Sequence, residues 1–286
     1  MKRSFFSLVW VIVIGQFALL SVHAEQSSGR LLATSGITQL EGSGGGGITP
    51  WAVISGHSLA DSTSLSVSHT KVDVKDFGLR VDAISASYDN RIELSAAQHT
   101  FSLKGTAINL RQDIFGIKYR LAGDLIYTTM PQLALGIQHK SLIDGDVAQA
   151  VGARDNQKGT DIYIAASKLH LGALAGYHVL WNATLRGTKA NQMGLLGFGG
   201  DSNSDYQWMP EFSLATVIHP QVAIGAEYRS KPDNLNAFKE DPYQDIFVAW
   251  FPSKQVNITL AYADLGSIAG SDSQRGLYAS LTAYLR

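Results

Sequence analysis

The stretch that decides the fold is VNITLAYA, residues 256–263. Every second residue from Val256 to Tyr262 is large and apolar, and the residues between them are small or polar. Successive side chains of a β-strand point to opposite faces, whereas an α-helix repeats every 3.6 residues. The stretch therefore predicts a strand with one apolar face and one small or polar face.

The same alternation recurs along the chain, and helical periodicity does not. It is clearest at residues 114–121, 133–138, 222–229 and 277–285. An all-β fold follows from this pattern. A β-sandwich would alternate in the same way, so the alternation alone does not place the apolar face against lipid.

The connections between these strands favour a membrane barrel. Short turns near 87–91, 129–131, 218–221 and 251–254 alternate with long polar connections near 141–159, 187–205, 230–242 and 264–275. Outer-membrane barrels have tight periplasmic turns at one rim and long outward loops at the other. The predicted fold is a transmembrane antiparallel up-and-down β-barrel.

The strand count follows from the hairpins. Thirteen strands can be placed between residues 49 and 286, and a barrel with both ends on the periplasmic side needs an even number. Residues 30–40, RLLATSGITQL, supply a further strand. We predict 14 strands, with 12 as the alternative.

The first 24 residues predict export. Lys2 and Arg3 precede an apolar run over residues 5–20, and Ala24 ends a small-residue cleavage site. We expect a signal peptide over 1–24, cleaved after Ala24, with a membrane-anchoring helix as the alternative. Residues 25–286 then form a single outer-membrane barrel domain, whose partners are the export and barrel-assembly machinery and outer-membrane lipid.

The composition agrees with a membrane location. Only 16% of the residues are charged, against about 25% in soluble domains. The chain has 28 glycines and no cysteine, which excludes disulfides and thiolate metal sites. The formal net charge of −1 gives no indication of a nucleic-acid partner.

Residues 41–51, EGSGGGGITPW, raise the possibility of a phosphate-binding loop. The lysine of such a loop is absent, because Ile48 follows Gly47, and Pro50 leads into an apolar stretch that is typical of a strand. No nucleotide cofactor is expected. Since glycine permits close backbone approach, we expect the connection 41–48 to pack against the rim or enter the lumen.

Metal and catalytic motifs are incomplete. Asp201, Asn203 and Asp205 have the spacing of a calcium loop, but Tyr206 stands where glycine is required. No two histidines are three or four residues apart, so neither a metal site nor any other cofactor is predicted. Ser167 and Ser213 lack a nucleophile-elbow motif, which leaves a barrel-embedded hydrolase as a minor alternative and no catalytic residue assigned.

Charged residues on the polar faces of the strands are predicted to line the lumen, because basic side chains facing lipid would each cost about 2–4 kcal/mol at mid-depth. They either brace the wall as ion pairs or line a pore. The set comprises Arg91, Glu93, Lys118, Arg120, Lys140, Asp161, Glu211, Glu227 and Arg229.

Residues 188–200, TKANQMGLLGFGG, are apolar and glycine-rich where an exposed loop would be polar. We predict that this loop folds inward as a constriction or lid, with an extended strand end as the alternative. Its apolar residues are Met193, Leu195, Leu196 and Phe198.

Long blocks of the chain resemble an uncharacterised domain-of-unknown-function family of Gram-negative envelope proteins. The blocks include LLATSGITQLEGSGGGGITPW, LRQDIFGIKYRLAGD and FVAWFPSKQVNITLAYADLGSIAG. The resemblance covers nearly the whole mature chain, implies an outer-membrane barrel and assigns no ligand or catalytic residue.

The function expected from these observations is a non-enzymatic channel or uptake pore for a small solute. One alternative is a plugged structural or partner-binding barrel without transport, and another is a soluble periplasmic β-protein.

Overall fold

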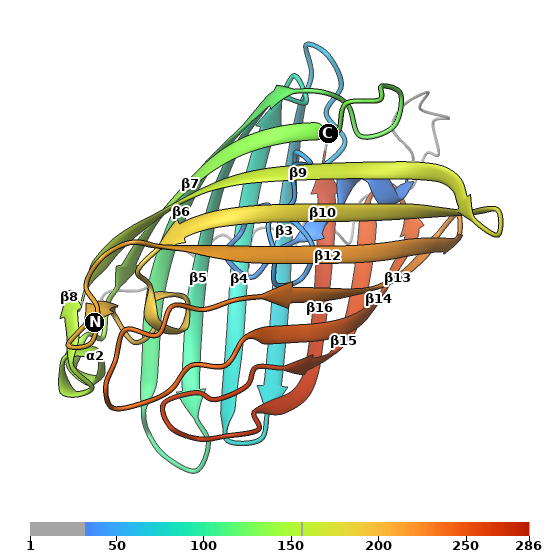
Figure 1. Cartoon of the computed structure of the whole chain (residues 1–286). Helices are drawn as coiled ribbons and strands as arrows, with labels where there is room; N and C mark the ends of the chain where they lie inside the picture. The colour runs from blue at the N-terminus through green and yellow to red at the C-terminus, as the bar shows by residue number, and fades with distance from the viewer. Residues whose placement is uncertain (1–31, 156, 286) are drawn as a thin grey trace.

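The computed structural model describes residues 32–155 and 157–285, so the signal-peptide prediction lies outside the described residues. Twelve antiparallel strands close into a barrel, in which each wall strand pairs with the next and the last pairs with the first (Figure 1). The wall consists of β3 (Thr63–Val74), β4 (Phe77–Tyr88), β5 (Ile92–Leu103), β6 (Asn109–Ala122), β7 (Gln132–Leu142), β9 (Lys158–Leu174), β10 (Tyr177–Thr188), β12 (Gln207–His219), β13 (Val222–Arg229), β14 (Tyr243–Ser253), β15 (Val256–Asp264) and β16 (Arg275–Leu285). The predicted up-and-down barrel is confirmed.

Short elements lie outside the wall. They are η1 (Leu32–Ser35), β1 (Ile37–Thr38), β2 (Gly44–Gly45), α2 (Asp146–Ala150), β8 (Ala153–Asp155), η2 (Asn191–Gly194) and β11 (Phe198–Gly200). No helix in the described ranges has the length and apolar character needed to cross a bilayer.

The barrel has 12 strands, which was the alternative prediction. The preferred prediction of 14 strands is wrong. The two surplus strands were placed at 30–40 and at 51–56, and the described residues of both stretches lie inside the barrel instead of in its wall. Residues 32–35 form the 3-10 helix η1, and residues 51–56 form no strand.

The two rims of the barrel differ. One carries the tight turns between β4 and β5, β9 and β10, β12 and β13, and β14 and β15, together with the start of β3 and the end of β16. The opposite rim carries the long connections from β7 to β9, β10 to β12, β13 to β14 and β15 to β16. We call these the turn rim and the loop rim. In outer-membrane barrels short turns are periplasmic, which makes the loop rim the outward one.

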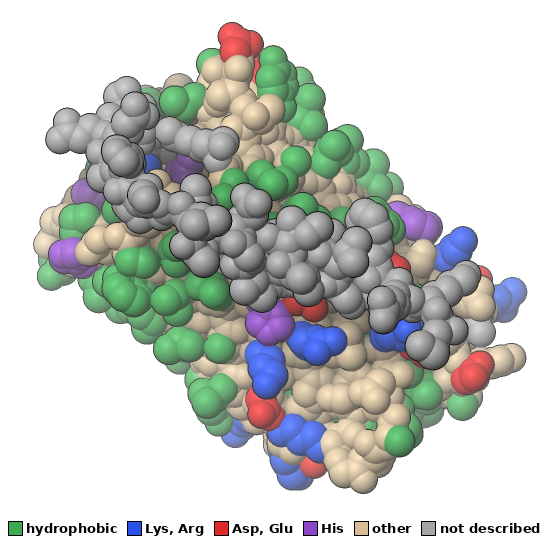
Figure 2. Space-filling model, turned by 180° about the vertical axis from the view of Figure 1, so that it is seen from behind, with side chains coloured by type: hydrophobic (Ala, Val, Ile, Leu, Met, Phe, Trp, Pro, Cys, Tyr) green, Lys and Arg blue, Asp and Glu red, His purple; other side chains and the backbone are tan. Residues whose placement is uncertain are grey.

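The outer face of the wall is apolar over much of its area. Large side chains such as Phe115, Ile246 and Leu277 are 57%, 71% and 67% exposed, whereas their neighbours along each strand point inward. Figure 2 shows hydrophobic side chains spread over this surface and charged ones gathered toward one end. Outward charges on β3 and β4, such as Lys71 and Arg80, lie in the strand halves nearer the loop rim. So broad an apolar surface is typical of contact with lipid.

Residues 32–58 fill much of the interior, and we call them the luminal segment. Residues 34–58 are all buried, and the segment, blue in Figure 1, lies within the ring of strands. It doubles back on itself where β1 pairs with β2. The carbonyl of Gly36 accepts a hydrogen bond from Tyr284 at the turn-rim end of β16, and Ser58 accepts one from Ser87 at the turn-rim end of β4. The segment thus enters and leaves at the turn rim, with the glycines at its tip.

The connection from β10 to β12 folds inward from the loop rim. Met193 and Leu195 join the apolar cluster inside the barrel, beside Val72 and Val74 of β3. Leu196 and Phe198 are buried as well, and β11 pairs with β8 of the neighbouring loop. Protein therefore enters the lumen from both rims.

Candidate functional site

Seven of the nine candidate lumen residues lie inside the barrel, none more than 4% exposed. These are Glu93, Lys118, Lys140, Asp161, Glu211, Glu227 and Arg229. The other two lie elsewhere. Arg91 is exposed in the turn after β4, beside Asp89 at 3.6 Å, and Arg120 is half-buried next to a register shift near the end of β6. Side chains in turns and at bulges do not follow the alternation of the strand.

Glu41, Arg186 and Asp245 are buried charged residues beside the predicted set that the sequence prediction missed. Arg186 could have been predicted from the alternation of β10, in which Leu185 points outward and the residues on either side of it, Thr184 and Arg186, point inward. Glu41 could have been noticed as the single Asp, Glu, Lys or Arg in residues 32–58.

Glu41 lies at the centre of the largest charged cluster. Arg229 of β13 donates from Nη1 to Oε2 at 2.9 Å and from Nη2 to Oε1 at 3.1 Å. Lys140 of β7 donates to Oε1, and Arg186 Nη2 of β10 lies 3.2 Å from Oε2. The luminal segment thus places its one ionised carboxylate among three basic residues of the wall, in a geometry that favours the charged form.

Two wall acids complete this cluster. Asp161 of β9 contacts Lys140 at 2.6 Å and Arg186 at 3.2 Å. Glu211 of β12 accepts from Arg186 Nε at 2.5 Å and lies 3.6 Å from Arg229. With Glu41 in place, three acids face three bases. The wall alone has one base in excess.

A second group of wall residues holds the backbone of the luminal segment. Glu93 accepts from the amides of Gly44 and Ser55 at 2.9 and 2.7 Å. Lys118 donates to the carbonyls of Gly44 and Val53 at 2.6 and 2.9 Å, and to Glu93 at 3.2 Å. An ion pair between adjacent strands therefore binds both arms of the segment.

Glu227 holds the tip from the other side. It accepts from the amide of Ile48 at 2.9 Å and from the hydroxyls of Thr49 and Ser213 at 2.6 and 2.7 Å. A Cβ atom on Gly46 would lie 1.8 Å from Glu227 Oε1. This contact explains one glycine of the GGGG run: the carboxylate occupies the space that a side chain would need.

Asp245 is the register partner of Glu227 on β14 and is 5% exposed. Among the described residues, neither of its carboxylate oxygens has a hydrogen-bond partner. A buried carboxylate without a partner is unfavourable. Unlike Glu227, Asp245 therefore makes no hydrogen bond to the luminal segment within the described ranges.

At the loop rim, Lys231 and Glu240 form a buried ion pair of 2.9 Å against the inward loop. Gln192 donates to Glu240 and to the carbonyl of Ser267, and it accepts from Tyr243 at 2.5 Å. We call Lys231, Glu240 and Gln192 the loop latch. Burial raises the pKa of Glu240, partly offset by Lys231, and burial lowers the pKa of Lys231. The latch fixes η2 inside the barrel mouth.

The two candidate serines form hydrogen bonds with the luminal segment. Ser167 accepts from the amide of Ala52 at 2.9 Å and donates to Asn182, and Ser213 bonds Trp51 and Glu227. Within the described ranges, neither hydroxyl bonds a histidine, and no group of three His, Asp or Glu residues could hold a metal ion. The geometry of a serine hydrolase is not assembled around either residue.

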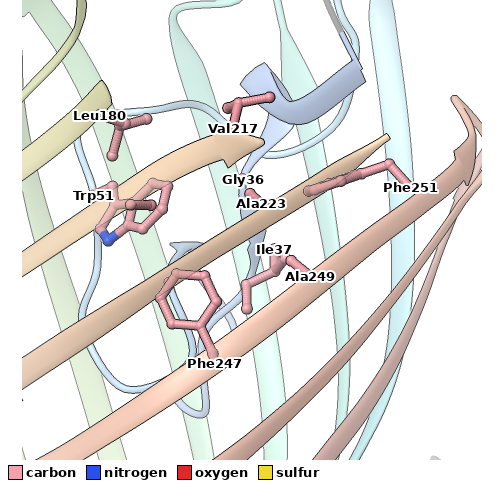
Figure 3. Close-up of a pocket in the computed structure, with 11 residues that line it drawn as sticks. Gly36, Ile37, Trp51, Leu180, Val217, Ala223, Phe247, Ala249 and Phe251 are labelled. Carbon is pink, nitrogen blue, oxygen red and sulfur yellow. The ribbon is translucent and has the colours of Figure 1, made fainter. Parts of the chain in front are cut away.

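Two small apolar cavities lie beside the segments that enter the lumen. A cavity of about 30 Å³ lies between Trp51 and Ile37 of the segment and Phe247 and Phe251 of β14 (Figure 3). A second, of about 20 Å³, lies beside Met193 and Leu195. Each has room for one or two water molecules. In this conformation protein occupies both regions of the lumen.

The chain belongs to the family described as "Protein of unknown function (DUF3034)", whose model matches residues 34–282. A search of curated proteins finds no match. This membership confirms the resemblance seen in the sequence and extends over all twelve wall strands except the last three residues of β16.

Solved structures with a similar fold are outer-membrane barrels. A KdgM porin in complex with disordered oligogalacturonate is 8% identical with a TM-score of 0.51, covering 77% of this chain and 99% of that one. The NanC porin is 11% identical with a TM-score of 0.47, covering 78% and 99%. The outer-membrane phospholipase A of Escherichia coli is 9% identical with a TM-score of 0.40, covering 79% and 92%. The match to the KdgM porin, with a TM-score of 0.51, shows that the chain has a porin-like barrel fold.

Proposed function

We propose that this protein is a non-enzymatic outer-membrane channel for small solutes, closed by the luminal segment and opened when that segment leaves the lumen. The observation that carries the proposal is that charged wall residues bind the backbone and the single carboxylate of a segment that is not part of the wall. Glu93 and Lys118 contact each other, but they also bind Gly44, Ser55 and Val53. Once the segment leaves, these groups would line a polar, water-filled passage.

The way the segment is attached supports reversible release. Within the described residues its covalent connection to the wall is at the start of β3, through residues 59–62 at the turn rim. Residues 59–61 are mostly exposed. Movement of residues 32–58 toward the periplasm therefore leaves every strand pairing of the wall intact. The inward loop, held by the loop latch, forms a second barrier at the other rim.

A reversible covalent lock tests the proposal, since the chain has no cysteine of its own. Thr49 Oγ1, directly after the tip, and Ser213 Oγ on β12 are 2.5 Å apart, so Thr49→Cys with Ser213→Cys places two thiols in contact. In planar bilayers the oxidised double variant is expected to be silent, and reductant is expected to restore openings. Thr49→Cys alone is the control, and its openings should not respond to reductant.

A plugged structural barrel predicts a different result. In that case oxidised and reduced forms are equally silent, although the protein is folded by its heat-dependent shift on gels. Silence of the reduced form and of a variant with a loosened segment would overturn the channel proposal. A chain that fractionates with soluble periplasmic contents would overturn the membrane location as well.

Export by residues 1–24, with cleavage after Ala24, completes the proposal. It would deliver the chain to the barrel-assembly machinery and to outer-membrane lipid. Amino-terminal sequencing of the mature protein checks the cleavage position, for which we expect Glu25 as the first residue.

A further inference from the structure

Glu41 occupies a site that the wall builds for a carboxylate. Lys140, Arg186 and Arg229 come from three different strands, and each is at most 4% exposed. Their nitrogens converge on the two oxygens of one carboxylate, with Arg229 donating to both. Two parallel bonds from one guanidinium are the geometry in which arginine recognises carboxylates.

The site is incomplete without an acidic ligand. When Glu41 leaves, Asp161 remains on Lys140 and Glu211 remains on Arg186. Among the described wall acids, Glu211 at 3.6 Å is the one that remains beside Arg229. Its other short contacts, to Glu41 and to the carbonyl of Ile48, both belong to the luminal segment. Arg229 then loses its two-bond contact with a carboxylate, and a carboxylate solute could form that contact again in place of water.

One nitrogen of the site, Arg186 Nη2, can still donate a hydrogen bond. Arg186 Nη2 lies 3.2 Å from Glu41 Oε2, yet among the described residues it makes no hydrogen bond of normal geometry. A ligand that is not tied to the luminal segment could move closer to this nitrogen. Gln39 donates to Glu41 Oε2 at 2.9 Å and leaves with the segment, so the free site consists of wall residues alone.

We propose that Lys140, Arg186 and Arg229 form a binding site for small carboxylate solutes, and that Glu41 is its internal occupant in the closed state. A carboxylate solute and Glu41 compete for the same donors, so binding of the solute favours release of the segment. The inference that carboxylate solutes are transported rests on the proposed channel function. The inference that the three basic residues bind a carboxylate does not depend on transport.

Chemical rescue tests the site directly. Glu41→Ala removes Cγ and the carboxylate, a fragment that acetate replaces. In the purified whole chain at neutral pH, we expect acetate to raise the melting temperature of Glu41→Ala saturably. Acetamide of the same shape and chloride at the same ionic strength should not. Gln39→Ala is the matched control, because it opens space at the same place without removing a charge, and acetate should not stabilise it selectively.

A second measurement covers the case in which Glu41→Ala does not fold. With Thr49→Cys in the otherwise natural chain, acetate should accelerate labelling of the thiol by a polar maleimide, and acetamide should not. The site is refuted if acetate does no more than chloride in either experiment. If rescue succeeds but bilayers stay silent, the site stands and the channel proposal fails, so the two failures are distinguishable.

Discussion

Replacing Gly45 by alanine should loosen the luminal segment without touching the wall. A Cβ atom on Gly45 would lie 2.4 Å from the carbonyl oxygen of Thr49 and 2.8 Å from the amide nitrogen of Trp51. Both atoms belong to the backbone of the returning arm, so no side chain can turn aside. Overpacking of this kind costs about 1–3 kcal/mol. Since 1.4 kcal/mol is tenfold in an equilibrium constant, the released population should rise roughly 5- to 150-fold.

Labelling of Thr49→Cys by a polar maleimide reads this population, because the residue is fully buried while the segment is in place. When closing is faster than labelling, the labelling rate follows the released fraction. Gly47→Ala is the matched control two residues away. Its Cβ would lie 3.3 Å from Glu227 Oε2, the end of a flexible side chain that can shift. Equal labelling rates for Gly45→Ala and Gly47→Ala would refute the reasoning that backbone crowding at the tip keeps the segment seated.

Two further predictions concern buried acids. Asp245→Asn removes a buried carboxylate that lies opposite Glu227 and has no hydrogen-bond partner within the described ranges, so it should not lower the free energy of unfolding, whereas Glu227→Gln should lower it by about 1–3 kcal/mol. Equal loss in both, measured by denaturant unfolding in detergent, would contradict this. Burial raises the pKa of Glu240, so its contribution to docking of the inward loop is complete below its unfolded pKa and is lost as the pH rises through the folded one. Hydrogen exchange of η2, corrected for intrinsic rates, should therefore be slower at pH 5 than at pH 7, and Glu240→Gln should reduce that difference.

The wall of the barrel was predictable because the lipid and the lumen impose opposite demands on alternate residues. In β15, Leu260 is 58% exposed on the outside while Asn257 is fully buried inside, as the period of two requires. Residues 51–54, WAVI, break that rule: they are apolar at successive positions, which indicates burial on both faces. That distinction could have removed the strand at 51–56 from the count.

The clusters inside the lumen could not be predicted in the same way. The contacts of Glu41 with Lys140, Arg186 and Arg229 span between 99 and 188 positions of the chain. They depend on the register of three separate strand pairs and on the path of a glycine-rich segment that forms no wall strand. Alternation predicts that a charge faces the lumen, but the partner is set by that path.

The luminal segment is attached in two different ways along its length. Its base, including Ile37, Trp51 and Val53, lies in the apolar cluster inside the barrel. Its tip, from Glu41 to Ile48, is held mainly by hydrogen bonds and ion pairs to wall residues. A buried ion pair can be close to neutral in net stability, and a typical hydrogen bond contributes only about 1 kcal/mol, because water replaces both when they separate. Burial of a large apolar side chain contributes about 1.5–3 kcal/mol. Release should therefore begin at the tip, where entering water restores the lost contacts, and the base at the turn rim should leave last.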